Sequence, residues 1–533
     1  MQKSFVYYFL LIVALAVVGC AKRGNITGGL KDTLAPVLRG SSPENGATNF
    51  NGKEIKLYFN EYVKLKNVSK QLIISPLMKN KPDVLPYNAS KFITIKLNDT
   101  LQPNTTYSLN FGQSIEDNNE GNILNQFKYV FSTGSYIDSL TLGVKLKDAI
   151  DLKTDTSVSV MLYEITEKYT DSTIYKEVPR YLSNSLESGD AIKLENIKEG
   201  KYQLIAIKDE NNNNKFDPKT DKIGFIKEVI SIPTDTLFQL ELFKEELPFK
   251  ALKPSQASGN RMIVGYQGNP KDVKIEVKKA DVVVPIQVTQ LPKKDSLQIW
   301  FPPIKNDSLA VSIAKNGFSA NHMVKMKDQK KDTLSISGST GGDLAFRKKF
   351  GLISSIPLKA VDASKITLFN KDSVKVNFTT TYDEWKQEVV FDFEKQPLEK
   401  YKLTVLPGAL TDFYEKKNDT LTYTLSTRNT SDYGNLRVIL ERVQRYPVIV
   451  EITDEKGVVM EREVVEKNTK VFFDLIEPKK YTLRVIYDDN KNGVWDAGNF
   501  IEKRQSEEVI YFAKEIDVRA NWDVEQPFDI GTK

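Results

Sequence analysis

Short segments in which polar and apolar residues alternate recur along the chain. Residues 54–59 (EIKLYF) and 92–97 (FITIKL) show this pattern clearly, and Pro, Asn and Asp separate such segments from one another. Because the side chains of a β-strand point alternately to opposite faces of its sheet, each segment would bury one face and expose the other. The sequence therefore predicts an all-β protein built from half-buried antiparallel sheets.

Length and charge limit the organisation of the chain and its partners. A chain of 533 residues exceeds what one hydrophobic core usually organises, so we expect about three to five domains. The 75 basic and 70 acidic side chains nearly cancel, and no run of like charges stands out. This balance argues against nucleic acid as a partner.

The amino terminus resembles the signal of bacterial lipoproteins. Lys3 precedes an apolar run at residues 5–18, which Gly19-Cys20 closes; the run is shorter than the about 20 residues of a transmembrane helix. The resemblance implies that residues 1–19 are a cleaved signal peptide and that the Cys20 thiol carries the lipid that anchors the protein in a bilayer. Because Cys20 is the only cysteine, an internal disulfide, a zinc–cysteine cluster and a cysteine nucleophile are excluded.

Residues 20–34 are polar, contain glycine and lack periodicity, which predicts a tether. No Asp directly follows Cys20, and this resembles lipoproteins that are sorted to the outer membrane. We therefore expect a lipid-anchored protein of the outer membrane. The sequence leaves open whether it faces the periplasm or the cell surface.

Residues 35–135 carry five landmarks in order: 42–46 (SPENG), 59–61 (FNE), 101–107 (LQPNTTY), 115–122 (IEDNNEGN) and 131–134 (FSTG). They resemble the bacterial Ig-like domain of the surface-layer type, and the resemblance implies a two-sheet sandwich. In such a sandwich Tyr107 and Leu109 would point inward. The adjacent Glu116 and Asp117 are interpreted as turn residues, because nothing nearby would separate their pKa values for acid–base work.

A weaker copy of this domain is predicted at residues 331–429. Tyr401 follows a Pro-containing turn, Asp412 follows 408–411 (GALT), and 425–427 (LST) closes the unit as 131–133 (FST) closes the first. The first half of the copy lacks the Asn-Glu landmark, so its start near residue 331 is the least defined boundary.

Two further segments form an internal repeat. Residues 201–217 align without gaps with residues 480–496. The surrounding segments, 136–247 and 430–533, resemble prealbumin-like or carboxypeptidase-regulatory-like β-modules. The predicted fold is thus a series of tandem β-sandwiches, Ig-like and prealbumin-like, after a lipoprotein signal peptide. Residues 248–330 match neither pattern, although 273–277 and 296–301 resemble strands.

The repeat contains an acidic loop that offers ligand chemistry. Asp and Asn at alternate positions, followed by Asp, resemble a calcium-binding loop; the residues are Asp209, Asn211, Asn213 and Asp217, with Asp488, Asn490, Asn492 and Asp496 as counterparts. The twelfth position, where a bidentate Glu completes such a loop, is Thr220 in one copy and Asn499 in the other. Two interpretations stay open: weak Ca²⁺ binding completed by a residue such as Asp221, or a hairpin whose Asx side chains cap their own backbone.

A short motif of Asp, then Ser or Thr, then an aliphatic residue or Thr recurs more often than average composition predicts. It resembles the O-glycosylation sequon of exported Bacteroidota proteins, and it also suits a turn that leads into a strand. The hydroxyl residues concerned are Thr33, Thr100, Ser139, Ser172, Thr236, Ser296, Ser308, Thr333, Ser373 and Thr420.

Residues for catalysis are scarce in the sequence. The only histidine, His322, has no cysteine or second histidine to complete a site. Gly-x-Ser-x-Gly, phosphate-loop and His-Glu-x-x-His motifs are absent from the sequence. A pair of carboxylates could still support hydrolysis. We therefore expect a protein that is not an enzyme and requires no cofactor, unless Ca²⁺ occupies the acidic loops.

The leading hypothesis is an outer-membrane lipoprotein that acts as a structural or protein-interaction module in the envelope. An outer-membrane β-barrel, or the machinery of its assembly or of secretion, is the expected kind of partner by fold-level analogy. The alternatives are a surface adhesin that binds glycan and a carboxylate-dependent hydrolase.

Overall fold

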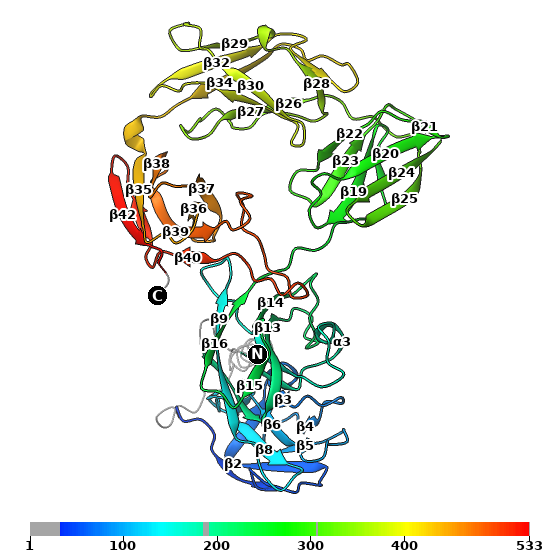
Figure 1. Cartoon of the computed structure of the whole chain (residues 1–533), viewed down its shortest axis with the longest axis vertical. Coiled ribbons are helices and arrows are strands. Elements are labelled where there is room, and N and C mark those ends of the chain that lie inside the picture. Colours follow the sequence, from blue (N-terminus) through cyan, green and yellow to red (C-terminus); the bar gives the residue numbers. More distant parts are fainter. Residues whose placement is uncertain (1–31, 185–190, 305–306, 532–533) are drawn as a thin grey trace, which may run out of the picture. The chain divides into compact units, whose positions relative to one another are not determined.

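The computed structural model describes residues 32–184, 191–304 and 307–531. The prediction of an all-β fold with tandem sandwiches is confirmed (Figure 1). The α-helices of the described residues are single turns, α2 (Val68–Gln71) and α3 (Thr173–Lys176). None of the helices in this part of the chain is long and apolar enough to cross a membrane. The predicted signal peptide, Cys20 and most of the tether lie outside the described residues.

Module 1, residues 38–132, is a sandwich of two sheets. One sheet has the order β1-β2-β5-β4 with β7 paired to the far end of β2, and the other has the order β3-β6-β8. Ile55, Leu57 and Ile95 are fully buried while Glu54 and Tyr58 are exposed, so the alternation in the sequence places one face of the sheet in the core. The strands are β1 (Leu38–Ser42), β2 (Glu54–Leu65), β3 (Ile73–Ser75), β4 (Asp83–Leu85), β5 (Ser90–Lys96), β6 (Thr106–Asn110), β7 (Ile115–Asp117) and β8 (Lys128–Ser132).

Module 2, residues 140–242, has one sheet of order β11-β10-β13-β14, with β15 paired to β13, and a second of order β12-β9-β16. Strands β9 and β16 are parallel. The strands are β9 (Leu140–Asp148), β10 (Ser159–Glu164), β11 (Tyr181–Asn184), β12 (Ala191–Ile197), β13 (Gly200–Lys208), β14 (Lys222–Phe225), β15 (Ile230–Ile232) and β16 (Leu237–Leu242).

Module 3, residues 250–325, is also a two-sheet sandwich. Residues 248–330, which match neither pattern in the sequence, therefore contain a β-sandwich of their own. Its sheets have the orders β17-β19-β23-β22, with β18 paired to β19, and β21-β20-β24-β25. The strands are β17 (Lys250–Ala251), β18 (Ser255–Ser258), β19 (Arg261–Gln267), β20 (Lys274–Lys279), β21 (Val282–Val283), β22 (Gln287–Gln290), β23 (Ser296–Trp300), β24 (Ser308–Lys315) and β25 (Phe318–Lys325).

Module 4, residues 336–426, repeats the strand order of module 1. Its sheets are β26-β27-β31-β30 and β29-β32-β34, and β28 pairs with β33 as the far end of β2 pairs with β7. The strands are β26 (Ile336–Gly338), β27 (Phe350–Ser354), β28 (Leu358–Val361), β29 (Ile366–Phe369), β30 (Thr379–Asp383), β31 (Glu388–Asp392), β32 (Lys400–Val405), β33 (Leu410–Asp412) and β34 (Leu421–Ser426), with a 3-10 turn at Ala363–Lys365.

Modules 1 and 4 have an equivalent hydrogen bond. The Tyr107 hydroxyl accepts from the backbone N–H of Gln102 at 2.9 Å, and the Tyr401 hydroxyl accepts from that of Gln396 at 2.6 Å. Both tyrosine rings are buried. The sequence landmark around the tyrosine therefore fixes the turn before the corresponding strands β6 and β32.

Module 5, residues 434–529, repeats the strand order of module 2. Its sheets are β37-β36-β39-β40, with β41 paired to β39, and β38-β35-β42, where β35 and β42 are parallel. The strands are β35 (Gly434–Glu441), β36 (Val448–Thr453), β37 (Val459–Val465), β38 (Lys470–Ile476), β39 (Lys479–Tyr487), β40 (Val509–Tyr511), β41 (Ile516–Val518) and β42 (Asp523–Asp529), after a 3-10 turn at Thr430–Asp432.

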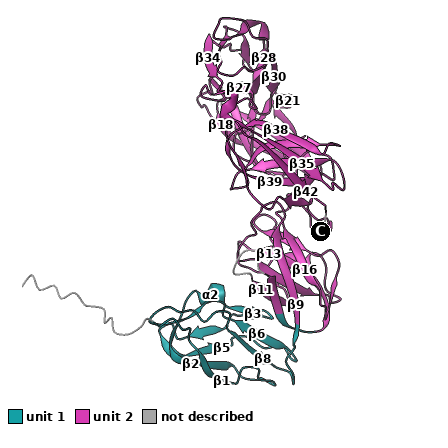
Figure 2. Ribbon diagram, turned by 90° about the vertical axis from the view of Figure 1, so that its left-hand side faces the viewer, with its two compact units in different colours: residues 1–140, 195–198 teal, residues 141–194, 199–533 magenta. Residues whose placement is uncertain are grey.

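The chain divides into two compact units (Figure 2). Residues 1–140 and 195–198 form the first, and residues 141–194 and 199–533 form the second. Module 1 thus belongs to the first unit, and modules 3, 4 and 5 share the second with most of module 2.

Candidate functional site

The acidic loop of module 2 joins β13 to β14 and holds itself together through its own side chains. The Asp209 carboxylate accepts from the backbone N–H groups of Asn211 at 3.1 Å and Asn214 at 2.6 Å. Buried Asp221 accepts from the N–H groups of Glu210 at 3.2 Å and Asp217 at 2.8 Å, and so closes the base of the loop. Burial raises the pKa of Asp209, and backbone donors partly offset it.

The acidic loop of module 5 has the same construction. Asp488 accepts from the N–H groups of Asn492 at 3.0 Å and Gly493 at 2.8 Å. Glu507 accepts from the N–H groups of Asp489 at 2.8 Å and Asp496 at 3.0 Å. These two donors are the repeat counterparts of Glu210 and Asp217, so Glu507 has the role that Asp221 has in module 2.

Sequence reasoning found Asp221 but missed Glu507. The insertion between Asp496 and Glu507 removes the constant spacing of the repeat, and no signal in the sequence replaces it. In each loop the first aspartate and the carboxylate at the base accept backbone N–H groups, and Asp496 accepts the side-chain amides of Asn490 and Asn492. These bonds within the loops favour the hairpin interpretation. Among the described residues, no group of three or more His, Cys, Asp or Glu side chains is arranged to hold a metal ion. Calcium binding stays a prediction.

The turn interpretation of Asp117 agrees with its geometry. Its buried carboxylate accepts from four successive backbone N–H groups, those of Asn119, Glu120, Gly121 and Asn122, at 2.6–3.1 Å. Burial raises the pKa of this carboxyl, but the four donors outweigh burial and hold the pKa below its ordinary value. The neighbouring Glu116 pairs with Lys64 and Lys66.

The ten hydroxyl residues of the recurrent motif all reach solvent. Ser172, Ser296 and Ser308 are half-buried, and the exposed ones are Thr33, Thr100, Ser139, Thr236, Thr333, Ser373 and Thr420. Ser139, Thr236 and Thr420 directly precede β9, β16 and β34. Residues of this motif can therefore both lead into strands and be reached by a modifying enzyme. Glycosylation stays a prediction. His322 lies half-buried on β25.

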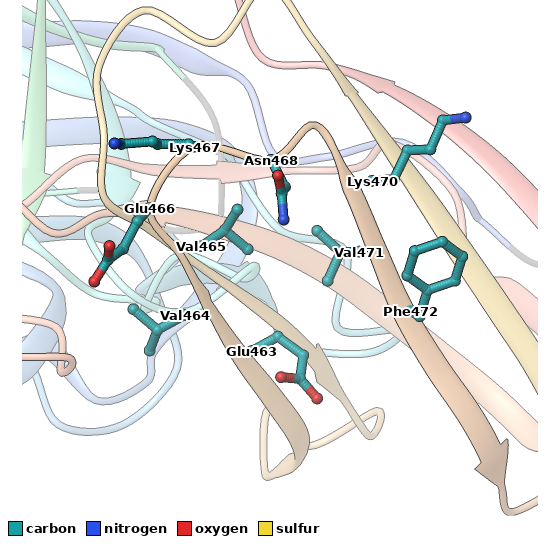
Figure 3. Close-up of a pocket in the computed structure, with 9 residues that line it drawn as sticks. All are labelled: Glu463, Val464, Val465, Glu466, Lys467, Asn468, Lys470, Val471 and Phe472. Atoms are coloured by element: carbon teal, nitrogen blue, oxygen red, sulfur yellow. The ribbon is translucent and has the colours of Figure 1, made fainter.

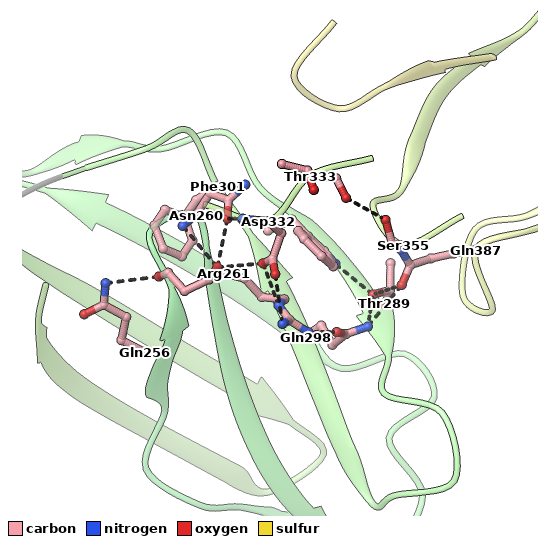
Figure 4. A network of polar contacts seen from close by, with 12 residues as sticks. Gln256, Asn260, Arg261, Thr289, Gln298, Phe301, Asp332, Thr333, Ser355 and Gln387 are labelled. Atoms are coloured by element: carbon pink, nitrogen blue, oxygen red, sulfur yellow. Dashed lines mark hydrogen bonds and ion pairs between the residues drawn. The ribbon is translucent and has the colours of Figure 1, made fainter. Parts of the chain in front are cut away.

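A buried polar network joins modules 3 and 4 (Figure 4). The side-chain amide of Gln298 on β23 donates to Gln387 Oε1 at 3.0 Å, and the Thr289 hydroxyl donates to the same oxygen at 3.1 Å. Trp300 donates to the Thr289 hydroxyl oxygen at 3.0 Å. All four side chains are buried, so the boundary between these modules excludes water and is specified by hydrogen bonds.

A second joint links modules 2 and 5, which are far apart in the sequence. Buried Arg484 of β39 pairs with buried Glu451 of β36 at 2.7 Å and donates to the carbonyl of Ile150 at 2.8 Å. The Phe500 ring packs edge-to-face on Phe225 with centroids 5.1 Å apart. The N–H of Phe500 donates to the buried Glu245 carboxylate at 2.6 Å, and burial raises the pKa of Glu245.

Module 5 also has a groove with a volume of about 520 Å³ between β37 and β38 (Figure 3). Each of these strands is the last in its sheet, so within the part of the chain that the structure describes each has one backbone edge without a neighbouring strand. Val465 and Val471 are buried at the groove, whereas Val464 and Phe472 are exposed. Charged residues of both signs, among them Glu466 and Lys470, complete the lining.

Comparison with known proteins confirms the first Ig-like domain. The family described as bacterial Ig-like domain matches residues 32–133, close to the predicted 35–135. No curated protein matches the chain.

The solved structures to which this chain is similar include the S-layer protein rSbsC(31–844). It is 12% identical, with 91% of this chain and 67% of that chain covered and a TM-score of 0.16. The titin domains Z1Z2 in complex with telethonin are 9% identical, with 34% of this chain and 95% of that chain covered and a TM-score of 0.13. The titin I-band fragment I67–I69 is 10% identical, with 53% of this chain and 99% of that chain covered and a TM-score of 0.13.

Proposed function

We propose that this protein is a non-enzymatic, lipid-anchored structural and interaction protein of the bacterial outer membrane. The observation that carries the proposal is that buried charged and polar groups of the second unit form hydrogen bonds between modules. Arg484 and Glu245 bind partners across the joint of modules 2 and 5, and Gln298 and Gln387 do so across that of modules 3 and 4.

Such joints suit a scaffold. Leaving a buried charge or a buried amide without its hydrogen-bond partner is costly, so these contacts favour the docking of module 3 on module 4 and of module 2 on module 5. Acid–base chemistry needs carboxyl groups that face a cleft with separated pKa values. The carboxylates of Asp117, Asp209 and Asp488 instead accept backbone N–H groups of their own loops.

The groove between β37 and β38 is the surface that we assign to the envelope partner. An unpaired strand edge beside apolar side chains accepts an extended segment of another protein as an added strand. Arg347 of module 4 pairs with Glu461 and Glu463 of β37 at 3.0 and 2.6 Å, which fixes one wall of the groove.

Crosslinking in intact envelopes, followed by purification of the protein with its crosslinked partners, tests the proposal. We expect a membrane-protein partner that is lost in Val464→Arg, which places a charge in the groove. The matched control is Val458→Arg, a similarly exposed valine before β37 that does not line the groove, and it should retain the partner. Recovery of the protein without any membrane-protein partner would contradict the proposal.

A further inference from the structure

The predicted tether reaches module 1 beside the middle of β2. The N–H of Val37 donates to the Asn60 side chain at 2.7 Å, and the N–H of Asn60 donates to the Val37 carbonyl at 3.1 Å. The Asp32 carbonyl accepts from the Asn122 side chain at 3.1 Å. Residue 32 therefore lies beside the loop that follows β7, and residue 37 lies at the edge of β2 with which β1 pairs.

Among the described residues, five large apolar side chains of this segment, β2 and β5 are exposed. Leu34 is 73% exposed, Val37 53%, Tyr62 56%, Phe92 45% and Tyr58 42%. We call these five residues the tether face. Tyr58 and Phe92 are register partners on β2 and β5, with ring centroids 6.5 Å apart. Exposed apolar groups are ordinary when scattered, but a contiguous set marks an interaction surface.

The chemistry of the tether face suits the boundary between lipid headgroups and acyl chains. Tyrosine has an apolar ring and a polar hydroxyl, and it is enriched at that depth of a bilayer. The ammonium group of Lys91 lies 5.5 Å from the centroid of the Tyr62 ring, and a lysine beside apolar surface can keep its charge at the headgroups while its stem lies deeper.

The length of the chain before residue 32 brings a bilayer within reach. Eleven residues lie between Cys20 and Asp32, and a fully extended segment of that length spans at most about 40 Å. A lipid on Cys20 would hold the tether face near the membrane surface at a high effective concentration, so a weak intrinsic affinity suffices for contact.

We propose that the tether face docks module 1 onto the surface of the bilayer that anchors the chain. This inference rests on the proposed lipid anchoring. Leu34, Val37, Tyr58, Tyr62 and Phe92 enter the interfacial layer, while Lys91 meets anionic headgroups. The lipid and the tether face then act as two linked membrane contacts, and module 1 lies on the membrane instead of moving freely at the end of its tether.

The single cysteine permits a direct test that does not depend on biological acylation. The full mature chain, from residue 20, is coupled through the Cys20 thiol to maleimide-bearing lipid in vesicles of phosphatidylethanolamine and phosphatidylglycerol. Hydroxyl-radical labelling with mass spectrometry then compares tethered with free protein. We expect labelling of Tyr58, Tyr62 and Phe92 to slow several-fold on tethering, while Tyr136 and Trp522, of similar exposure, keep their rates.

Each other outcome overturns the proposal. Unchanged labelling of the tether face means that it does not dock, and slowing of Tyr136 as well means general shielding by the vesicle. Slowing in the free chain with soluble envelope polysaccharide would assign the face to glycan. The double variant Tyr58→Ser/Tyr62→Ser should lose the protection of Phe92, and Tyr136→Ser should keep it. Because maleimide replaces acylation, an unlipidated natural protein would refute the anchor without altering this result.

Discussion

At the residue scale, single buried carboxylates define turns in this protein. Asp117 in module 1 and Asp412 in module 4 occupy corresponding positions as the last residues of β7 and β33, and both are buried. Asp117 accepts four backbone N–H groups, whereas Asp412 accepts those of Tyr414 and Lys416, each at 2.8 Å. Burial raises the pKa of Asp412, and its two donors do not reverse the shift.

This difference predicts that a fall in pH weakens the contribution of Asp117 to stability and strengthens that of Asp412. The folded-state pKa of Asp117 lies below its ordinary value of 3.8, so its contribution to stability is present above about pH 4 and is lost as the pH falls further. Asp117→Asn should therefore destabilise module 1 near neutral pH, by about 2 kcal/mol, and flatten its acid sensitivity. Asp412→Asn, the matched variant, should cost less because a buried charge is removed. Calorimetric melts of both variants at neutral and acidic pH measure these changes in stability. Equal losses of stability in the two variants would refute this account.

Glycosylation is a second prediction at this scale. If the exposed Thr and Ser residues of the recurrent motif are modified, the native protein should be heavier than its polypeptide mass in repeated glycan increments. Intact-mass spectrometry of protein isolated from its own cells measures this. A bare polypeptide mass would leave all ten motifs as turns that lead into strands.

At the element scale, the two acidic loops are closed by a carboxylate at their base. Glu507 uses both oxygens to accept backbone N–H groups, and a glutamine would present an amide group to one of these donors. Glu507→Gln should therefore lower the stability of module 5 by about 2 kcal/mol. Glu508→Gln, a neighbouring half-buried position that pairs with Arg445, should change it little. Thermal melts compare the two variants.

The same melts test calcium. Metal that binds only the folded state must raise the melting temperature with concentration. Loops without the bidentate Glu belong to the weak class of about 10⁻⁴ to 10⁻³ M, so millimolar calcium is the informative range. The hydrogen-bonded loops lead us to expect no shift. A calcium-dependent rise that magnesium does not reproduce, and that Asp488→Asn removes, would establish the metal site instead.

At the scale of the whole molecule, the joint between modules 2 and 5 holds together segments separated by hundreds of residues. Phe500 is fully buried and Ile501 beside it is exposed. Truncating a buried phenylalanine costs about 3 to 5 kcal/mol, so Phe500→Ala should open the joint, and Ile501→Ala should not. Hydrogen exchange should speed up in β14 and in residues 497–508 of the first variant only. Protection equal to that of the wild type would contradict the joint.

Anchoring also belongs to this scale. Cys20→Ser removes the only thiol, so it should block lipid attachment and cleavage after Gly19, and the protein should leave the detergent phase on partitioning. A variant that partitions like the wild type, with a mature terminus at residue 20, would refute the lipoprotein assignment.

The sequence alone determined the all-β class, the first Ig-like domain and the internal repeat, because strand periodicity, turn residues and a constant spacing are local signals. The tertiary structure decided which groups meet across long separations. Glu507 at the base of its loop, Gln298 with Gln387, and Arg484 with the Ile150 carbonyl are such pairs. Their hydrogen bonds depend on how the chain returns upon itself, and no local pattern in the sequence encodes that path.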